Sequence, residues 1–105
     1  MDVKHVQNEM RHVSDDLRAI IELFRPKVTN PNHTLMQKYT LVGQRIREYE
    51  HAVFAHANGN KGENLHQRKA NVIAALTGFE AALGHCEIKF KDAHHRIHKL
   101  KHSIH

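Results

Sequence analysis

Apolar residues recur at alternating intervals of three and four along almost the whole chain. In the first segment the stripe consists of Val3, Val6, Met10, Val13, Leu17, Ile20 and Phe24. This spacing is typical of a helix that buries one narrow stripe against other helices, whereas a half-buried strand requires strict alternation. Asp2 is placed to cap the helix and Pro26 cannot continue it, so we expect a first helix over residues 2–24.

A second helix is expected over residues 34–57. Thr34 and Gln37 have the spacing of a capping box, in which two side chains satisfy backbone N–H groups of the first turn. The apolar stripe continues through Leu35, Tyr39, Val42, Ile46, Tyr49 and Val53. Gly59 follows the last turn, where a glycine can adopt the left-handed conformation of a C-terminal cap.

The third stretch keeps the same spacing without a change of phase. Its stripe consists of Val72, Leu76, Phe79, Leu83, Cys86, Phe90, Ala93, Ile97, Leu100 and Ile104. A break at Gly84, followed by a short fourth helix, is one alternative, because glycine weakens a helix interior by about 1 kcal/mol. The unbroken phase and the lack of turn residues beside Gly84 favour a continuous helix over residues 63–104.

We therefore expect an all-α fold: an antiparallel helical hairpin packed on a long third helix, with coiled-coil-like contacts, in a single domain of residues 1–105. At 1.5 Å per residue the third helix would be about 63 Å long, and each of the others about 35 Å. The two short helices would then leave the end of the long helix uncovered.

This uncovered end predicts a docking surface, because exposing apolar area costs roughly 25 cal/mol per Å². The apolar residues of the predicted surface are Phe90, Ile97, Leu100 and Ile104, and the basic residues beside them are Lys89, Lys91, Arg96, Lys99 and Lys101. We expect a homodimer joined through residues 83–104, or a complex with another protein. The corresponding function is a non-enzymatic adaptor, regulator or inhibitor, of the kind that phages and plasmids encode.

Histidine is the unusual residue type, with twelve in 105 residues and six in the last 21. His94, His98 and His102 follow one another at intervals of four, which places them in line along a helix. Two imidazoles at this spacing can share Zn²⁺ or Ni²⁺, but a closed zinc site needs four ligands. Such pairs are about as frequent as the composition predicts. Metal binding is therefore an alternative hypothesis, and no cofactor is expected.

Catalytic motifs have little support. Cys86 falls on the apolar stripe, where a thiol acts as a small inert hydrophobe. Ser14 and Ser103 have no adjacent turn that would present a hydroxyl. The Glu-x-x-His pairs do not fall on the apolar stripes, and no phosphate-binding loop is present. We expect no enzymatic activity.

Charge and hydropathy suggest the partners and the compartment. Sixteen Lys and Arg against eleven Asp and Glu give a net charge of +5, so nucleic-acid binding through the basic C-terminal helix is a second alternative. No stretch reaches the roughly 18 apolar residues of a membrane span, and the first ten residues lack the apolar core of a secretory signal. A single cysteine fits a reducing compartment, and we expect a cytoplasmic protein.

Overall fold

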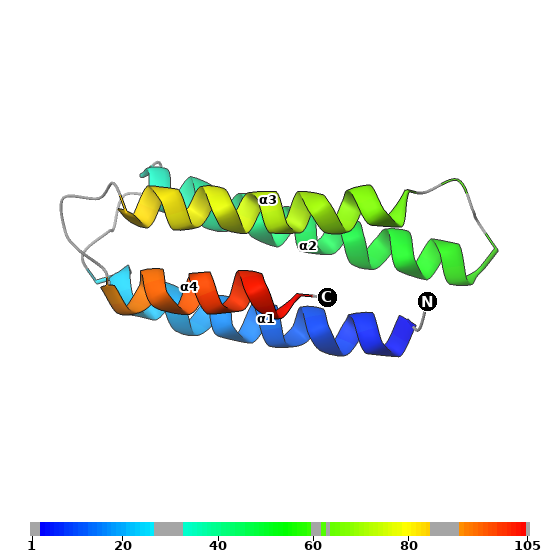
Figure 1. Ribbon diagram of the computed structural model, residues 1–105, viewed down its shortest axis with the longest axis horizontal. Helices are drawn as coiled ribbons and strands as arrows, with labels where there is room; N and C mark the ends of the chain where they lie inside the picture. Colours follow the sequence, from blue (N-terminus) through cyan, green and yellow to red (C-terminus); the bar gives the residue numbers. More distant parts are fainter. Residues whose placement is uncertain (1–2, 27–32, 60–61, 63, 85–90, 105) are drawn as a thin grey trace.

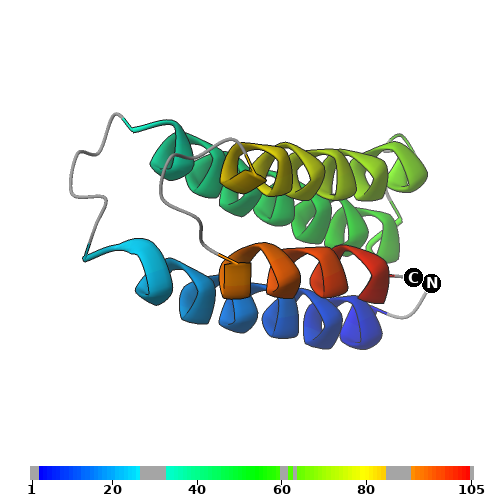
Figure 2. The same cartoon turned by 60° about the vertical axis from the view of Figure 1, so that its left-hand side comes forward.

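The computed structural model describes residues 3–26, 33–59, 62, 64–84 and 91–104. They form four helices: α1 (Val3–Phe24), α2 (Thr34–Ala57), α3 (Leu65–Gly84) and α4 (Lys91–Ser103). Consecutive helices run in opposite directions and lie side by side, and α4 also packs against α1 (Figures 1 and 2). The molecule is an up-down-up-down four-helix bundle, which confirms the expected all-α class.

The continuous third helix expected over residues 63–104 is wrong. α3 ends at Gly84, and α4 begins at Lys91 and runs back along α3 (Figure 1). Each of the two helices buries its own apolar stripe in the same core, and the spacing of a stripe does not specify which neighbouring helix covers it. Cys86 and Phe90, which belong to the predicted stripe, lie outside the described residues.

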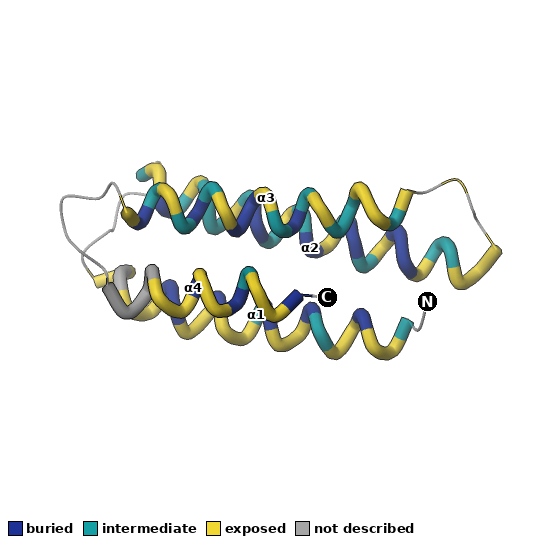
Figure 3. The backbone as a smooth tube through the Cα atoms, viewed as in Figure 1, coloured by how far each residue is buried: buried dark blue, intermediate teal, exposed yellow. Residues whose placement is uncertain are grey.

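The core consists of the predicted stripes brought together in the middle of the bundle (Figure 3). The largest fully buried side chains are Tyr49, Phe79, Met10, Ile20, Leu35, Leu76 and Ile97. Among the described residues no charged side chain is buried. Burial of these stripes, rather than helix propensity alone, is what stabilises helices of this length in water.

Local capping sets the ends of α2. His33, rather than Thr34, is the N-cap: its backbone is extended and its Nδ1 accepts a hydrogen bond from the Leu35 N–H at 3.1 Å. The capping box expected at Thr34 is therefore wrong by one residue, because an imidazole nitrogen takes the role that a hydroxyl usually has. At the other end Gly59 has φ +97°, as the sequence predicted, and its N–H donates to the carbonyl of His56 at 3.1 Å.

Candidate functional site

α4 lies between α1 and α3 and buries its apolar stripe against them (Figure 2). Ile97 is 0% exposed, Leu100 4% and Ile104 8%. Three of the four apolar residues that the sequence analysis assigned to a partner are thus covered by their own chain. The physical basis for a homodimer joined through residues 83–104 is lost with this finding.

The outward face of α4 has a different character, because it is exposed and basic. Its exposed residues are His95, Arg96, His98, Lys99, His102 and Ser103. Within the described part of the chain neither Arg96 nor Lys99 is within ion-pair distance of an acidic group. Four Lys or Arg against one Asp give α4 a net charge of +3, more than half of the +5 of the whole chain.

Three residues of the predicted set lie where the structure describes little or nothing. Lys89 and Phe90 lie outside the described residues, between α3 and α4. Lys91 begins α4, but its side chain is outside the described part. The described basic face is therefore made by residues 95–103.

A cluster of three polar side chains connects α4 to α3. Nδ1 of His98 lies 3.0 Å from Oε2 of Glu80, and Nζ of Lys101 donates to Oε1 of Glu80 at 3.3 Å. The side chains of Glu80 and Lys101 are both only 17% exposed. Lys101 is thus a seam residue whose charge is neutralised within the chain, unlike Arg96 and Lys99.

The environment of Glu80 favours its charged form. Partial burial raises the pKa of Glu80, but the hydrogen bonds and positive charges of His98 and Lys101 outweigh burial and hold this pKa below its usual value. Glu80 is therefore ionised at neutral pH and lies against the basic helix. This carboxylate holds α4 against α3 through His98 and Lys101, and among the described residues it forms no ion pair with Arg96 or Lys99.

The histidines of α4 do not form a metal site within the described residues. The rings of His98 and His102 meet edge to face, with centroids 4.6 Å apart. No group of three or more His, Cys, Asp or Glu in the described ranges is placed to hold a metal ion. His94 belongs to α4, but its side chain is outside the described part.

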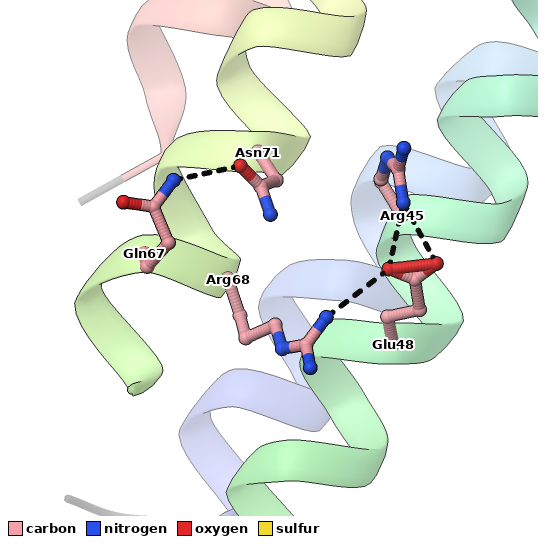
Figure 4. A network of polar contacts seen from close by, with 5 residues as sticks. All are labelled: Arg45, Glu48, Gln67, Arg68 and Asn71. Atoms are coloured by element: carbon pink, nitrogen blue, oxygen red, sulfur yellow. Dashed lines mark hydrogen bonds and ion pairs between the residues drawn. The ribbon is translucent and has the colours of Figure 1, made fainter. Parts of the chain in front are cut away.

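A second polar cluster lies between α2 and α3 (Figure 4). Arg45 donates to both carboxylate oxygens of Glu48 at 2.9 Å, and Arg68 of α3 reaches the same carboxylate at 3.4 Å. On α3, Gln67 donates to Asn71 at 2.9 Å. The sequence reveals the spacing of Arg45 and Glu48 on one helix but not the approach of Arg68, which depends on how α2 and α3 pair. These arginines are held by Glu48 and offer less free charge than the cations of α4.

A groove of about 420 Å³ follows the seam of α1 and α4. It is lined by His5, Asn8, Glu9, His12, Asp16, Leu100 and Ser103. Nε2 of His5 lies 3.8 Å from Oε2 of Glu9. Burial raises the pKa of Tyr49, and the negative charge of Glu9 raises it further. The Glu9 carboxylate therefore lines the groove and also disfavours ionisation of the Tyr49 hydroxyl in the core.

No described helix is long and apolar enough to cross a membrane. Comparisons of the chain with protein-family models, with curated proteins and with solved structures found no match. The function must therefore be inferred from the surface of the bundle.

Proposed function

We propose that this chain is a non-enzymatic helical interaction protein that binds an acidic surface of another protein through the outward face of α4. The observation that supports this function is the exposed pair Arg96 and Lys99, whose charges no described acidic group neutralises. A helix with a net charge of +3 attracts an acidic partner over a distance of about 8–10 Å at moderate salt. Such a protein would act as an adaptor, a regulator or an inhibitor.

The proposed interface is polar, unlike the apolar stripe that the sequence analysis favoured. The burial of Ile97, Leu100 and Ile104 fixes which side of α4 points outward, and so determines which residues form the proposed interface. The contact of Glu80 with His98 and Lys101 holds the helix in place. Surface charges of this kind chiefly increase the rate and specificity of association, so the affinity is expected to depend strongly on salt.

An acidic protein surface fits this face better than a nucleic acid does. Strong phosphate-mediated binding of duplex DNA involves about six to ten neutralised phosphates. The described face offers two unpaired cations, since Lys101 is held by Glu80. The histidine rings between the cations can donate hydrogen bonds to the carbonyl and carboxylate acceptors of a protein partner.

Fluorescence anisotropy with labelled poly-L-glutamate as the acidic probe tests the proposal. The test variant is Arg96→Ala/Lys99→Ala, and the matched control is Arg11→Ala/Arg18→Ala, which removes the same charge from exposed positions of α1. We expect the α4 variant to bind at least about tenfold more weakly than the wild type, and the control to change by less than about threefold, because only the α4 pair would contact the probe.

Two results would overturn this function. If both double variants weaken binding equally, the probe responds to net charge and not to α4. If a labelled duplex of about 20 base pairs binds more tightly than poly-L-glutamate at about 200 mM salt, the nucleic-acid hypothesis replaces the protein hypothesis.

Metal binding through His94, His98 and His102 stays a separate prediction with its own test. Zn²⁺ is titrated into untagged wild-type protein and into His98→Ala/His102→Ala, and calorimetry measures the affinity. Binding tighter than about 1 μM that the double variant loses would favour a metal-binding function. Weak binding at the millimolar level would discard it.

A further inference from the structure

The groove between α1 and α4 has acidic side chains on its α1 wall. Glu9 and Asp16 both line the groove and lie seven residues apart on the same side of α1. At 1.5 Å per residue they are about 10 Å apart along the helix. Asp16 is exposed, and among the described residues it forms no ion pair.

Glu9 is the more enclosed of the two acids, with a side chain that is only 13% exposed. In the described part of the chain its one ion-pair partner is His5, whose Nε2 lies 3.8 Å from Oε2 of Glu9, beyond hydrogen-bond distance. The hydroxyl of Ser103, on the other wall of the groove, donates to the carbonyl of Leu100 at 2.7 Å and not to Glu9. A carboxylate that has lost most of its water is stabilised by a hydrogen-bond donor, and most strongly by a cationic one.

The end of α4 adds to the negative character of the groove. α4 ends at Ser103, which lines the groove beside Leu100. The last carbonyl groups of a helix have no partner within the helix, and together they act as a negative charge of about half an elementary charge. Lys101, in the same turn, is held by Glu80 on the α3 side. The groove therefore favours a positively charged group.

The basic face of α4 adjoins this groove. Arg96 precedes Leu100 by four residues and Ser103 by seven, so it lies on the side of α4 that borders the groove. Lys99 precedes Ser103 by four residues, or one turn. Opposite charges thus follow one another along the seam, within about 10 Å of helix length between Arg96 and Ser103.

We propose that the groove between α1 and α4 receives a lysine or arginine side chain of the same partner whose acidic residues bind Arg96 and Lys99. This proposal rests on the function proposed for α4 and specifies the partner. The partner would present a segment in which a basic side chain follows acidic ones at a spacing of about 10 Å. Its ammonium or guanidinium group would donate to Glu9, and Asp16 would attract it further.

A side chain of a partner suits this groove better than a free amine does. The net charge of +5 repels small cations from the chain as a whole. Acidic residues that bind α4 would bring an attached basic side chain to the groove at an effective concentration in the millimolar range. The same basic face that repels a free cation thus recruits a tethered one.

Fluorescence anisotropy with two labelled peptides at about pH 7.5 and about 50 mM salt tests the proposal. Both peptides carry about six glutamates, a Gly-Gly spacer and an amidated last residue. This residue is arginine in one peptide and citrulline, its uncharged isostere, in the other. The spacer reaches about 7 Å when extended, so the last side chain can enter the groove while the glutamates contact α4. Net charge alone favours the citrulline peptide, because it is the more acidic of the two.

We expect the wild type to bind the arginine peptide about fivefold more tightly than the citrulline peptide, because a charge-assisted hydrogen bond forms in the groove. Glu9→Gln should lose this preference, and Asp16→Asn should reduce it. The matched control is Glu22→Gln, which removes the same charge from an exposed position of α1 and should keep the preference. Circular dichroism checks that the three variants keep the helix content of the wild type.

Three results would overturn the proposal for the groove. They are equal or weaker binding of the arginine peptide by the wild type, a preference that survives in Glu9→Gln, and binding of free spermidine as tight as that of the arginine peptide and lost in Glu9→Gln. The last result would assign the groove to a free amine.

The function proposed for α4 fails separately. It fails if the citrulline peptide binds the wild type and Arg96→Ala/Lys99→Ala equally, whatever the groove does. If neither peptide binds the wild type, both proposals are wrong.

Discussion

Nδ1 of His98 lies 3.0 Å from Oε2 of Glu80, although the two residues are 18 positions apart in the chain. On one continuous helix they would be separated by about 27 Å. Their contact exists because α4 runs back along α3 and brings a basic helix beside the carboxylate of Glu80. Lys101 contacts the same carboxylate at 3.3 Å. Glu80 is therefore the polar anchor of α4.

Replacing Glu80 by glutamine should weaken this anchor. The change removes a negative charge but keeps the size of the side chain, so we expect Glu80→Gln to lower the free energy of unfolding by about 0.5–1.5 kcal/mol. Urea denaturation at pH 7 measures the difference. Glu22→Gln is the control, because the ion pair of Glu22 with Arg25 is 62% exposed on both sides and contributes little. Equal effects of the two substitutions would contradict the role of Glu80.

The contribution of Glu80 should depend on pH in a defined direction. His98 and Lys101 hold the pKa of Glu80 below its usual value despite the opposing effect of burial. A depressed pKa in the folded state stabilises the fold above the pKa of the unfolded chain, and this stabilisation is lost as the pH falls through the folded pKa. The difference between wild type and Glu80→Gln should therefore shrink as the pH falls below about 4.5, where the carboxylate becomes protonated. A difference that grows below this pH would refute the assignment.

Glu50 should behave in the opposite way. Burial raises the pKa of Glu50, so its charged form is less favourable in the folded state than in the unfolded chain. A raised carboxyl pKa lowers stability as the pH rises through the titration range. We expect Glu50→Gln to stabilise the protein at pH 7, and this gain to disappear below about pH 4. Thermal melts of the wild type and Glu50→Gln at pH 7 and at about pH 4 measure this gain. A Glu50→Gln variant that is less stable than the wild type at pH 7 would exclude this effect of Glu50.

Two glycines should respond to alanine with opposite signs. Gly78 lies inside α3 with room for a Cβ, so Gly78→Ala should raise the free energy of unfolding by up to about 1 kcal/mol. Gly59 has φ +97° and nothing within 4 Å, so Gly59→Ala should cost roughly 1–2 kcal/mol through backbone strain alone. Urea denaturation of dilute protein compares the two. If Gly78→Ala is less stable than the wild type, α2 and α3 must pack too closely at Gly78 to admit a methyl group.

The sequence predicts which side chains are buried better than it predicts which helix covers them. Ile97, Leu100 and Ile104 fall on the predicted stripe and are buried, but by α1 and α3 and not by a second chain. The spacing could not show this, because a stripe shows which side of a helix is apolar and not which neighbour covers it. Gly84 was the only local sign of a break.

The candidate site was predictable only in its composition. Arg96 and Lys99 were assigned to the binding surface from sequence, and both are exposed. Lys101 was assigned with them, but it lies in the seam beside Glu80. That difference depends on the pairing of α3 with α4. The spacing of residues within one helix cannot reveal how two helices pair.

Small-angle X-ray scattering of dilute monomer tests the reversal of the chain after Gly84 most directly. The folded bundle has a Cα radius of gyration of 14.4 Å and a longest extent of 47 Å. We expect the measured maximum dimension to be close to this extent, with a hydration layer added. A monomer of 60 Å or more, about the length of an unbroken helix over residues 63–104, would contradict the fold and the basic face that depends on it.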